Sequence, residues 1–184
     1  MKIGNTTWFL LSMLTVLLFA LPLQAGDLTF FVGGVNPGTI TYKDVKTDLD
    51  GSPIYGARLG MNFVPYFGME HTLAFSSDFL FPHNVAGITE AKGFVYNSNL
   101  IFNMPFRKTI PYFTVGAGLI HQYGDSDMPV GTKFAFNYGG GLKFPRLAGP
   151  LGLRFDMRGY RAGTISNKLN MLEISGGLLI SFGK

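Results

Sequence analysis

Apolar and polar residues alternate along most of the chain after residue 25. Between residues 112 and 121 one face carries Phe113, Val115, Ala117 and Leu119. The opposite face carries Tyr112, Thr114, Gly116 and Gly118, with Ile120 as an apolar exception. Successive side chains of a β-strand point to opposite faces, whereas a helix would scatter them with a period of 3.6. The pattern therefore predicts strands with one apolar face.

The alternation recurs in segments of about ten residues, the length of a membrane-spanning strand. These segments are 28–35, 54–63, 67–77, 94–104, 112–121, 132–144, 151–160 and 169–182. Short connections at 64–66, 105–111 and 145–150 contain proline, whereas those at 36–53, 78–93, 122–131 and 161–168 are longer and polar. Short turns on one side and long loops on the other are typical of outer-membrane barrels. We predict an all-β fold, an eight-stranded antiparallel up-and-down transmembrane β-barrel with both chain ends on the short-turn side.

The charged residues within these segments all share the phase opposite to the apolar face. They are Arg58, Glu70, Lys143, Arg154, Asp156, Arg158 and Glu173. A Lys or Arg facing lipid at the bilayer midplane costs about 2–4 kcal/mol. We therefore predict that the seven side chains form a polar network that closes the lumen. A turn centred on Val64 would place Arg58 opposite Glu70.

The composition removes several other classes of protein. Charged residues make up 14% and aromatic residues 15%, with 25 Gly, which fits neither a disordered chain nor a soluble helical bundle. The absence of Cys excludes disulfides and thiol chemistry. The net charge of +4 comes without a run of Lys or Arg, so we expect no nucleic-acid partner.

The N-terminus has the pattern of an export signal. Lys2 precedes an apolar run at 8–21, which ends at Pro22, and Ala25 supplies a small residue before Gly26. A charged start, an apolar core and a small residue at the cleavage site describe a secretory signal peptide. We predict a signal peptide over 1–25 and a barrel domain over 26–184. The alternative is a retained anchor helix, for which the run is short.

Five segments carry a resemblance to a known family. They are YGARLGMNF at 55–63, FGME at 67–70, PYFTVGAG at 111–118, NYGGGLK at 137–143 and GLRFDMR at 152–158. In order and spacing the chain resembles the small eight-stranded outer-membrane barrels grouped with the transmembrane domain of outer membrane protein A and its X-type relatives. The resemblance implies a place in the cell outer membrane, contact with outer-membrane lipid, insertion by the barrel-assembly machinery and a monomeric state. Such barrels usually end on an aromatic residue that this machinery reads, whereas here Phe182 is followed by Gly183 and Lys184.

The expected role is structural or one of surface interaction, with the long loops available to a surface ligand. An eight-stranded barrel encloses packed side chains rather than a wide pore, which disfavours a narrow passive channel. A lipid-modifying enzyme similar to lipid A deacylases is the other alternative, but His121 and Ser126 do not form the compact motif of those enzymes. The three His residues lack metal-ligand spacing. We predict no enzyme activity, no cofactor and no metal site.

Overall fold

The computed structural model describes residues 25–38, 40–42, 45–47, 49–80, 91–124, 130–163 and 169–183. The predicted signal peptide lies outside these residues except for Ala25, which begins the first strand. No helix long and apolar enough to cross a membrane occurs among the described residues.

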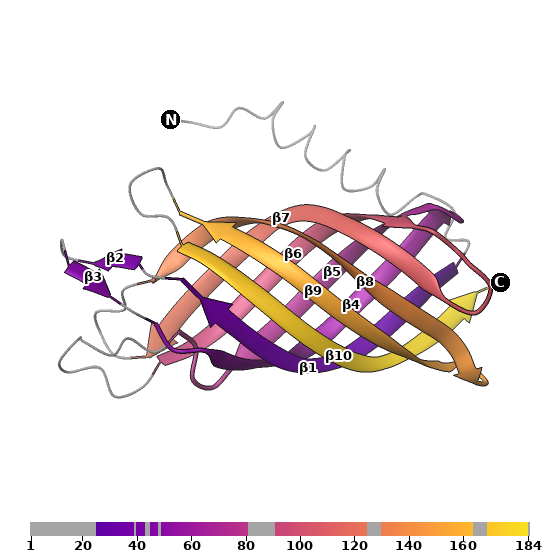
Figure 1. The fold of residues 1–184 in the computed structure, drawn as a ribbon, viewed down its shortest axis with the longest axis horizontal. Coiled ribbons are helices and arrows are strands. Elements are labelled where there is room, and N and C mark those ends of the chain that lie inside the picture. Colours follow the sequence, from indigo (N-terminus) through magenta and orange to yellow (C-terminus); the bar gives the residue numbers. More distant parts are fainter. Residues whose placement is uncertain are drawn as a thin grey trace, which may run out of the picture.

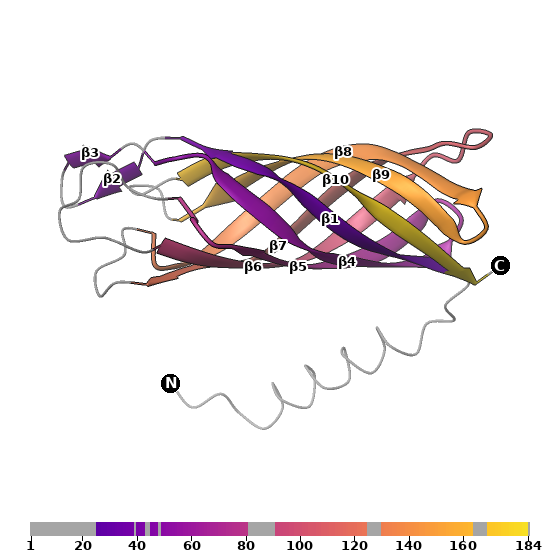
Figure 2. The ribbon, with the colours of Figure 1, turned by 90° about the horizontal axis from the view of Figure 1, so that it is seen from below.

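Eight long strands close into one antiparallel barrel (Figures 1 and 2). They are β1 (Ala25–Pro37), β4 (Ser52–Val64), β5 (Phe67–Ser76), β6 (Ala91–Asn103), β7 (Ile110–Gly124), β8 (Thr132–Ala148), β9 (Leu151–Ala162) and β10 (Leu169–Gly183). Each strand pairs with its neighbours in the sequence, and β1 closes the ring by pairing with both β4 and β10. The predicted fold class and strand number are confirmed.

The two ends of the barrel differ as the loop lengths indicated. At one end, which we name the short-turn end, residues 65–66, 104–109 and 149–150 connect consecutive strands. Ala25 pairs with Gly183 at this end, so the barrel begins and finishes there (Figure 1). The opposite, long-loop end carries a hairpin of β2 (Ile40–Tyr42) and β3 (Val45–Thr47). This hairpin lies in a connection for which the sequence predicted only a loop.

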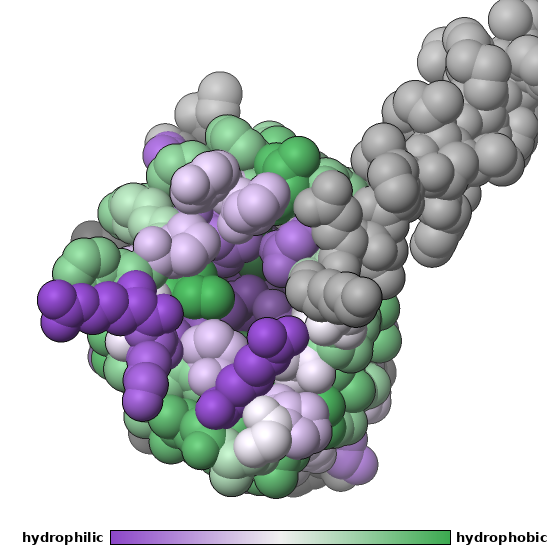
Figure 3. All heavy atoms as spheres, turned by 90° about the vertical axis from the view of Figure 1, so that its right-hand side faces the viewer, coloured by the Kyte–Doolittle hydropathy of each residue, from purple (hydrophilic) through white to green (hydrophobic). Residues whose placement is uncertain are grey.

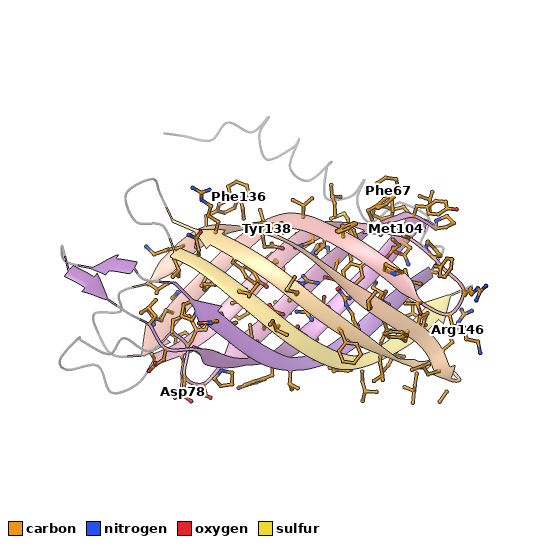
Figure 4. The ribbon with its side chains drawn as sticks, in the orientation of Figure 1. Phe67, Asp78, Met104, Phe136, Tyr138 and Arg146 are labelled. Atoms are coloured by element: carbon orange, nitrogen blue, oxygen red, sulfur yellow. The ribbon has the colours of Figure 1, made fainter. Side chains whose placement is uncertain are left out.

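The outer wall is apolar because every second side chain of each strand points outward. Exposed residues of this kind include Phe30, Leu100, Phe113, Phe136 and Ile174. Seen from the short-turn end, hydrophobic residues surround a hydrophilic hollow (Figure 3). Figure 4 shows the side chains of Phe67, Phe136 and Tyr138 on the outside of the ribbon. Lipid is the solvent that suits such a wall.

Several strands extend beyond their predicted limits. β1 begins at Ala25 rather than at residue 28, β6 begins at Ala91 rather than at 94, and β8 reaches Ala148 rather than 144. Hydrogen bonds between neighbouring strands continue beyond the apolar part of the outer wall. In that outer region the outward side chains no longer need to be hydrophobic. Hydropathy therefore marks the membrane-facing part of a strand and not its end.

Candidate functional site: a charged network and an apolar plug inside the barrel

The seven charged residues that the sequence singled out all lie inside the barrel and are buried. Arg58, Glu70, Arg154, Arg158 and Glu173 are 0% exposed, and Lys143 and Asp156 are 3% and 4% exposed. They come from β4, β5, β8, β9 and β10, and each occupies an inward position of its strand. The barrel thus brings residues 115 positions apart in the chain, Arg58 and Glu173, into contact.

Asp156 is the centre of this cluster, because three arginines bind it. Arg58 Nη1 lies 3.1 Å from Asp156 Oδ2, Arg154 Nε lies 3.0 Å from the same oxygen, and Arg158 Nη2 lies 3.0 Å from Oδ1. The Tyr112 hydroxyl donates a further hydrogen bond to Oδ1. A carboxylate surrounded by charged donors in this way is strongly stabilised inside a protein.

Glu70 and Glu173 extend the cluster to either side. Glu70 binds Arg154 Nη1 and Arg158 Nη2, each at 2.5 Å. Glu173 binds the Arg58 guanidinium and accepts hydrogen bonds from Tyr160 Oη at 2.6 Å and Ser175 Oγ at 2.7 Å. The Arg58 guanidinium carbon also lies 3.6 Å from the centre of the Phe31 ring. Both carboxylates are therefore paired with arginine and hydrogen-bonded.

The sequence reasoning missed Asp27, which lies near the short-turn end. Its Oδ2 is 2.6 Å from Lys143 Nζ, and its Oδ1 is 3.6 Å from Arg154 Nη1. The predicted strand began at Leu28, but Asp27 has the same parity as Thr29 and was a detectable inward position. With Asp27 included, four cations (Arg58, Lys143, Arg154, Arg158) face four carboxylates (Asp27, Glu70, Asp156, Glu173). We name these eight residues the charged network.

The predicted pairing of Arg58 with Glu70 across the first hairpin is wrong. Glu70 lies opposite Gly60, and Arg58 lies opposite Thr72. The turn is formed by Pro65 and Tyr66 rather than centred on Val64, so the partner of Arg58 shifts by two residues, from Glu70 to Thr72. Glu70 instead reaches across the lumen to Arg154 and Arg158 on β9. The charges still pair within the barrel, but with partners on distant strands.

Smaller polar side chains fill the lumen beside the charges. Asn99 Nδ2 donates to Thr114 Oγ1 at 2.9 Å and to Asn137 Oδ1 at 2.5 Å. Asn103 Nδ2 donates to Asn62 Oδ1 at 3.0 Å, close to the short-turn end. A cavity of about 250 Å³ opens there, between Asp27, Lys143 and residues of the turns. This cavity corresponds to the hollow that Figure 3 shows. It ends inside the barrel at the charged network.

The long-loop end of the lumen is apolar, which the sequence did not predict. Buried hydrophobic side chains meet there, and we name them the apolar plug: Val35, Leu49, Ile54, Phe79, Leu80, Ile120 and Val130. Ile120, which broke the polar pattern of its face, belongs to this plug and is 0% exposed. Phe79 fits because Gly93 has no side chain, since a Cβ at Gly93 would lie 2.1 Å from the Phe79 ring.

Hydrogen bonds hold the plug in the barrel mouth. The Leu80 amide donates to Ser52 Oγ at 2.7 Å. Gln122 Nε2 donates to the carbonyl oxygens of Phe79 at 2.9 Å and Leu80 at 3.1 Å, and Gln122 Oε1 accepts from the Val130 amide at 2.9 Å. One buried side chain on β7 thus binds the segments that follow β5 and precede β8. These bonds pair the backbone amides of Leu80 and Val130 and the carbonyls of Phe79 and Leu80, as buried polar groups require.

The described histidines lie on the outer wall, away from the charged network. His71 Nδ1 is 3.2 Å from Tyr96 Oη, and His121 Nδ1 is 2.7 Å from Thr132 Oγ1. The His121 ring also stacks on Tyr123. Within the described ranges, no group of three or more His, Cys, Asp or Glu residues is arranged to hold a metal ion.

A closed antiparallel barrel with an apolar wall and a polar interior defines a class, the small outer-membrane β-barrel proteins. The sequence matches the family described as "Outer membrane protein beta-barrel domain" over residues 11–182, and the chain belongs to that family. No curated protein matches the sequence. Family and fold together place the protein in the cell outer membrane.

Three solved structures illustrate the similarity. Neisserial surface protein A is 12% identical, with a TM-score of 0.63 over 86% of this chain and 97% of that chain. OprG from Pseudomonas aeruginosa is 13% identical, with a TM-score of 0.63 over 88% and 97%. The outer membrane enzyme PagL is 12% identical, with a TM-score of 0.53 over 84% and 98%. Identities this low show a shared fold alone.

Proposed function

We propose that the protein is a closed structural barrel, and that its specific role lies in surface interaction through the segments at the long-loop end. One observation carries the proposal. The lumen is filled at two levels, by the charged network and by the apolar plug. Eight strands enclose room for packed side chains and not for an aqueous channel. The seven predicted lumen residues thus act structurally, by joining the strands to one another across the interior.

Conductance measurements test the closed lumen. We expect purified protein in planar lipid bilayers to give no single-channel steps, whereas an established porin in the same bilayers does. A variant with a widened mouth, Phe79→Ala with Ile120→Ala, keeps the charged network and should also stay silent. Stable steps from the unmodified protein would contradict the proposal and favour a narrow passive channel.

The proposal also excludes catalysis on lipid. Among the described residues, the His121 ring and the Thr132 hydroxyl form the pair that comes nearest to an activated nucleophile, but such a pair needs a third group that orients the base. Among the described residues the partners of the ring are Thr132 and Tyr123, and neither is a carboxylate. Ser126, the other residue considered from the sequence, lies outside the described residues. PagL supports this alternative only through a common fold.

Mass spectrometry of lipid A distinguishes a structural barrel from a lipid-modifying enzyme. Cells with the gene, cells without it and cells carrying His121→Ala should yield the same lipid A masses. Loss of an acyl chain that requires both the gene and His121 would establish an enzyme. Thr132→Val is the second test variant, because it removes the candidate nucleophilic hydroxyl and keeps the shape of the side chain, and it too should leave the lipid A masses unchanged.

We further propose that the protein inserts as a monomer with the help of the barrel-assembly machinery. Closure leaves no unpaired strand edge in the barrel, and a free edge is what would recruit another chain by strand pairing. Phe182 on β10 packs beside Gly26 of β1 at the seam of the ring. Phe182→Ala should slow insertion in cells but leave refolding in detergent unchanged. Dimers in analytical ultracentrifugation would contradict the monomer.

A surface role requires the long-loop end to face outward. Asp78 and Arg146 lie at opposite ends of the barrel (Figure 4). The chain has no Cys, so Asp78→Cys and Arg146→Cys each give a single label site. An impermeant thiol reagent should label Asp78→Cys on intact cells and Arg146→Cys only after lysis. The reverse result would invert the orientation and remove the basis for a surface ligand.

A further inference from the structure

The lipid-facing wall is hollowed across β7, β8 and β9. The hollow has a volume of about 870 Å³ and reaches as far as Leu172 and Ile174 on β10. We name it the wall groove and define it by Phe113, Tyr138, Gly140, Leu142, Phe155 and Met157. Phe113, Tyr138 and Met157 are 62%, 64% and 58% exposed, so the rim of the groove is open to the membrane.

The groove exists because one outward position has no side chain. Gly140 follows Phe136 and Tyr138 in the outward phase of β8, and it pairs with Phe113 on β7 and Met157 on β9. On the neighbouring strand β9, the outward Gly159 is covered by an aromatic ring, since a Cβ there would lie 2.9 Å from the Tyr138 ring. At Gly140 the nearest side-chain atom to such a Cβ is Phe113 Cδ1, at 3.4 Å. The floor of the groove is therefore bare backbone.

Hydrocarbon is the chemistry that fits this space. The groove lies at mid-strand on a wall that faces lipid, and its rim consists of aromatic and aliphatic side chains. A smooth wall contacts many acyl chains weakly, whereas a groove surrounds one chain and gains dispersion contacts along its length. Met104 and Pro111 line the groove at the short-turn end, so a chain lying in it runs toward that end.

The charge at this end matches an anionic headgroup. The turn of residues 104–109 begins with Met104 and carries Arg107 and Lys108. Its tip also presents Phe106, which is 67% exposed and lies under the Arg107 guanidinium at 5.6 Å. The described short turns, 65–66, 104–109 and 149–150, contain no Asp or Glu. Basic residues beside a membrane attract anionic lipid.

We propose that the wall groove holds one acyl chain of an anionic glycerophospholipid from the leaflet on the short-turn side. The phosphate of this lipid lies against Arg107 and Lys108, and Phe106 anchors the turn in the headgroup region. This lipid is a bound ligand with a defined seat, distinct from the lipid that covers the remaining wall.

Tryptophan quenching by brominated lipid tests the proposal. The chain has one Trp, Trp8, so Trp8→Phe with Phe113→Trp places a single reporter on the rim of the groove. The matched control is Trp8→Phe with Leu59→Trp, because Leu59 is exposed on β4, four strands away from β8 on either side of the ring. Each variant is refolded into vesicles of phosphatidylcholine containing brominated phosphatidylglycerol or brominated phosphatidylcholine.

At Phe113→Trp we expect quenching to show a preference for the anionic lipid on the order of five-fold, which is what one basic contact would give. The preference should be larger if Arg107 and Lys108 both contact the phosphate. At Leu59→Trp the two lipids should quench equally. Adding Arg107→Gln and Lys108→Gln should abolish the preference at the groove. Equal quenching at Phe113→Trp, the same preference at both reporters, or a preference that survives the two Gln substitutions would each overturn the proposal.

Discussion

The charged network and the apolar plug lie in succession along the same lumen, and they fill it according to different rules. In the network each side chain has particular partners, such as the three arginines around Asp156. In the plug, Phe79 and Ile120 need only neighbours of suitable volume. Losing one ionic partner leaves a buried charge uncompensated, whereas losing apolar volume leaves a cavity that neighbours partly refill. The network should therefore be the less tolerant of the two regions.

The largest effect is expected from Asp156→Asn, which breaks the centre of the network. The side chain keeps its shape, but three arginines lose their shared carboxylate and four cations then face three anions. Removal of one partner from a buried ionic cluster costs about 3–5 kcal/mol. Urea unfolding in lipid vesicles measures this loss. Asp78→Asn, an exposed carboxylate outside the network, is the control and should leave the free energy of unfolding unchanged.

An intermediate effect is expected from Phe79→Ala in the plug. Phe79 is 1% exposed, and its truncation should cost about 3 kcal/mol, the lower limit for a buried Phe, because the site lies at the barrel mouth. Hydrogen exchange should quicken at Leu80 and Val130 while the amides of β9 around Asp156 stay protected. Faster exchange in β9 as well would show that the two regions form one cooperative unit.

The alternation of residues predicted the barrel, its strand number and the inward phase of the seven charges, because lipid enforces that pattern on every strand. It could not predict which charges meet. The turn at Pro65 and Tyr66 places Arg58 opposite Thr72 rather than Glu70. Hydropathy carries no signal for this difference, because a shift of two residues keeps the same side chains inward. Phe79 lies in a connection that has no periodicity at all. Ile120, an apolar residue on a polar face, was one sign that the plug exists, and Val35 and Ile54, apolar at inward positions of their strands, were others.

A double-mutant cycle compares the partner of Glu70 that the sequence predicted, Arg58, with one that the structure shows, Arg154. Glu70 contacts Arg154 directly, at 2.5 Å, whereas Arg58 is linked to Glu70 indirectly, through Asp156 and the two arginines that bind both carboxylates. Residues in contact show coupling energies of about 0.5–3 kcal/mol. We expect coupling in the upper half of this range for Glu70→Gln with Arg154→Met and a clearly smaller value for Glu70→Gln with Arg58→Met. Equal coupling would mean that the network responds as a whole, without individual partners.

The smallest effect is expected from Gln122→Met, which tests whether the plug depends on directional hydrogen bonds at all. Met keeps the length and apolar volume of the side chain but removes the bonds to Phe79, Leu80 and Val130. Each hydrogen bond contributes about 0.5–1.5 kcal/mol net, and groups freed at the barrel mouth can turn to water. We therefore expect the free energy of unfolding in urea to fall by about 1 kcal/mol, with hydrogen exchange quickened only at Leu80 and Val130.

The control is Ser98→Ala, because Ser98 is a half-buried polar residue on the outer face of β6 that has no contact with the plug. A loss as large as that of Asp156→Asn would show that the plug, like the network, is specified by its bonds, and the contrast between the two regions would fail.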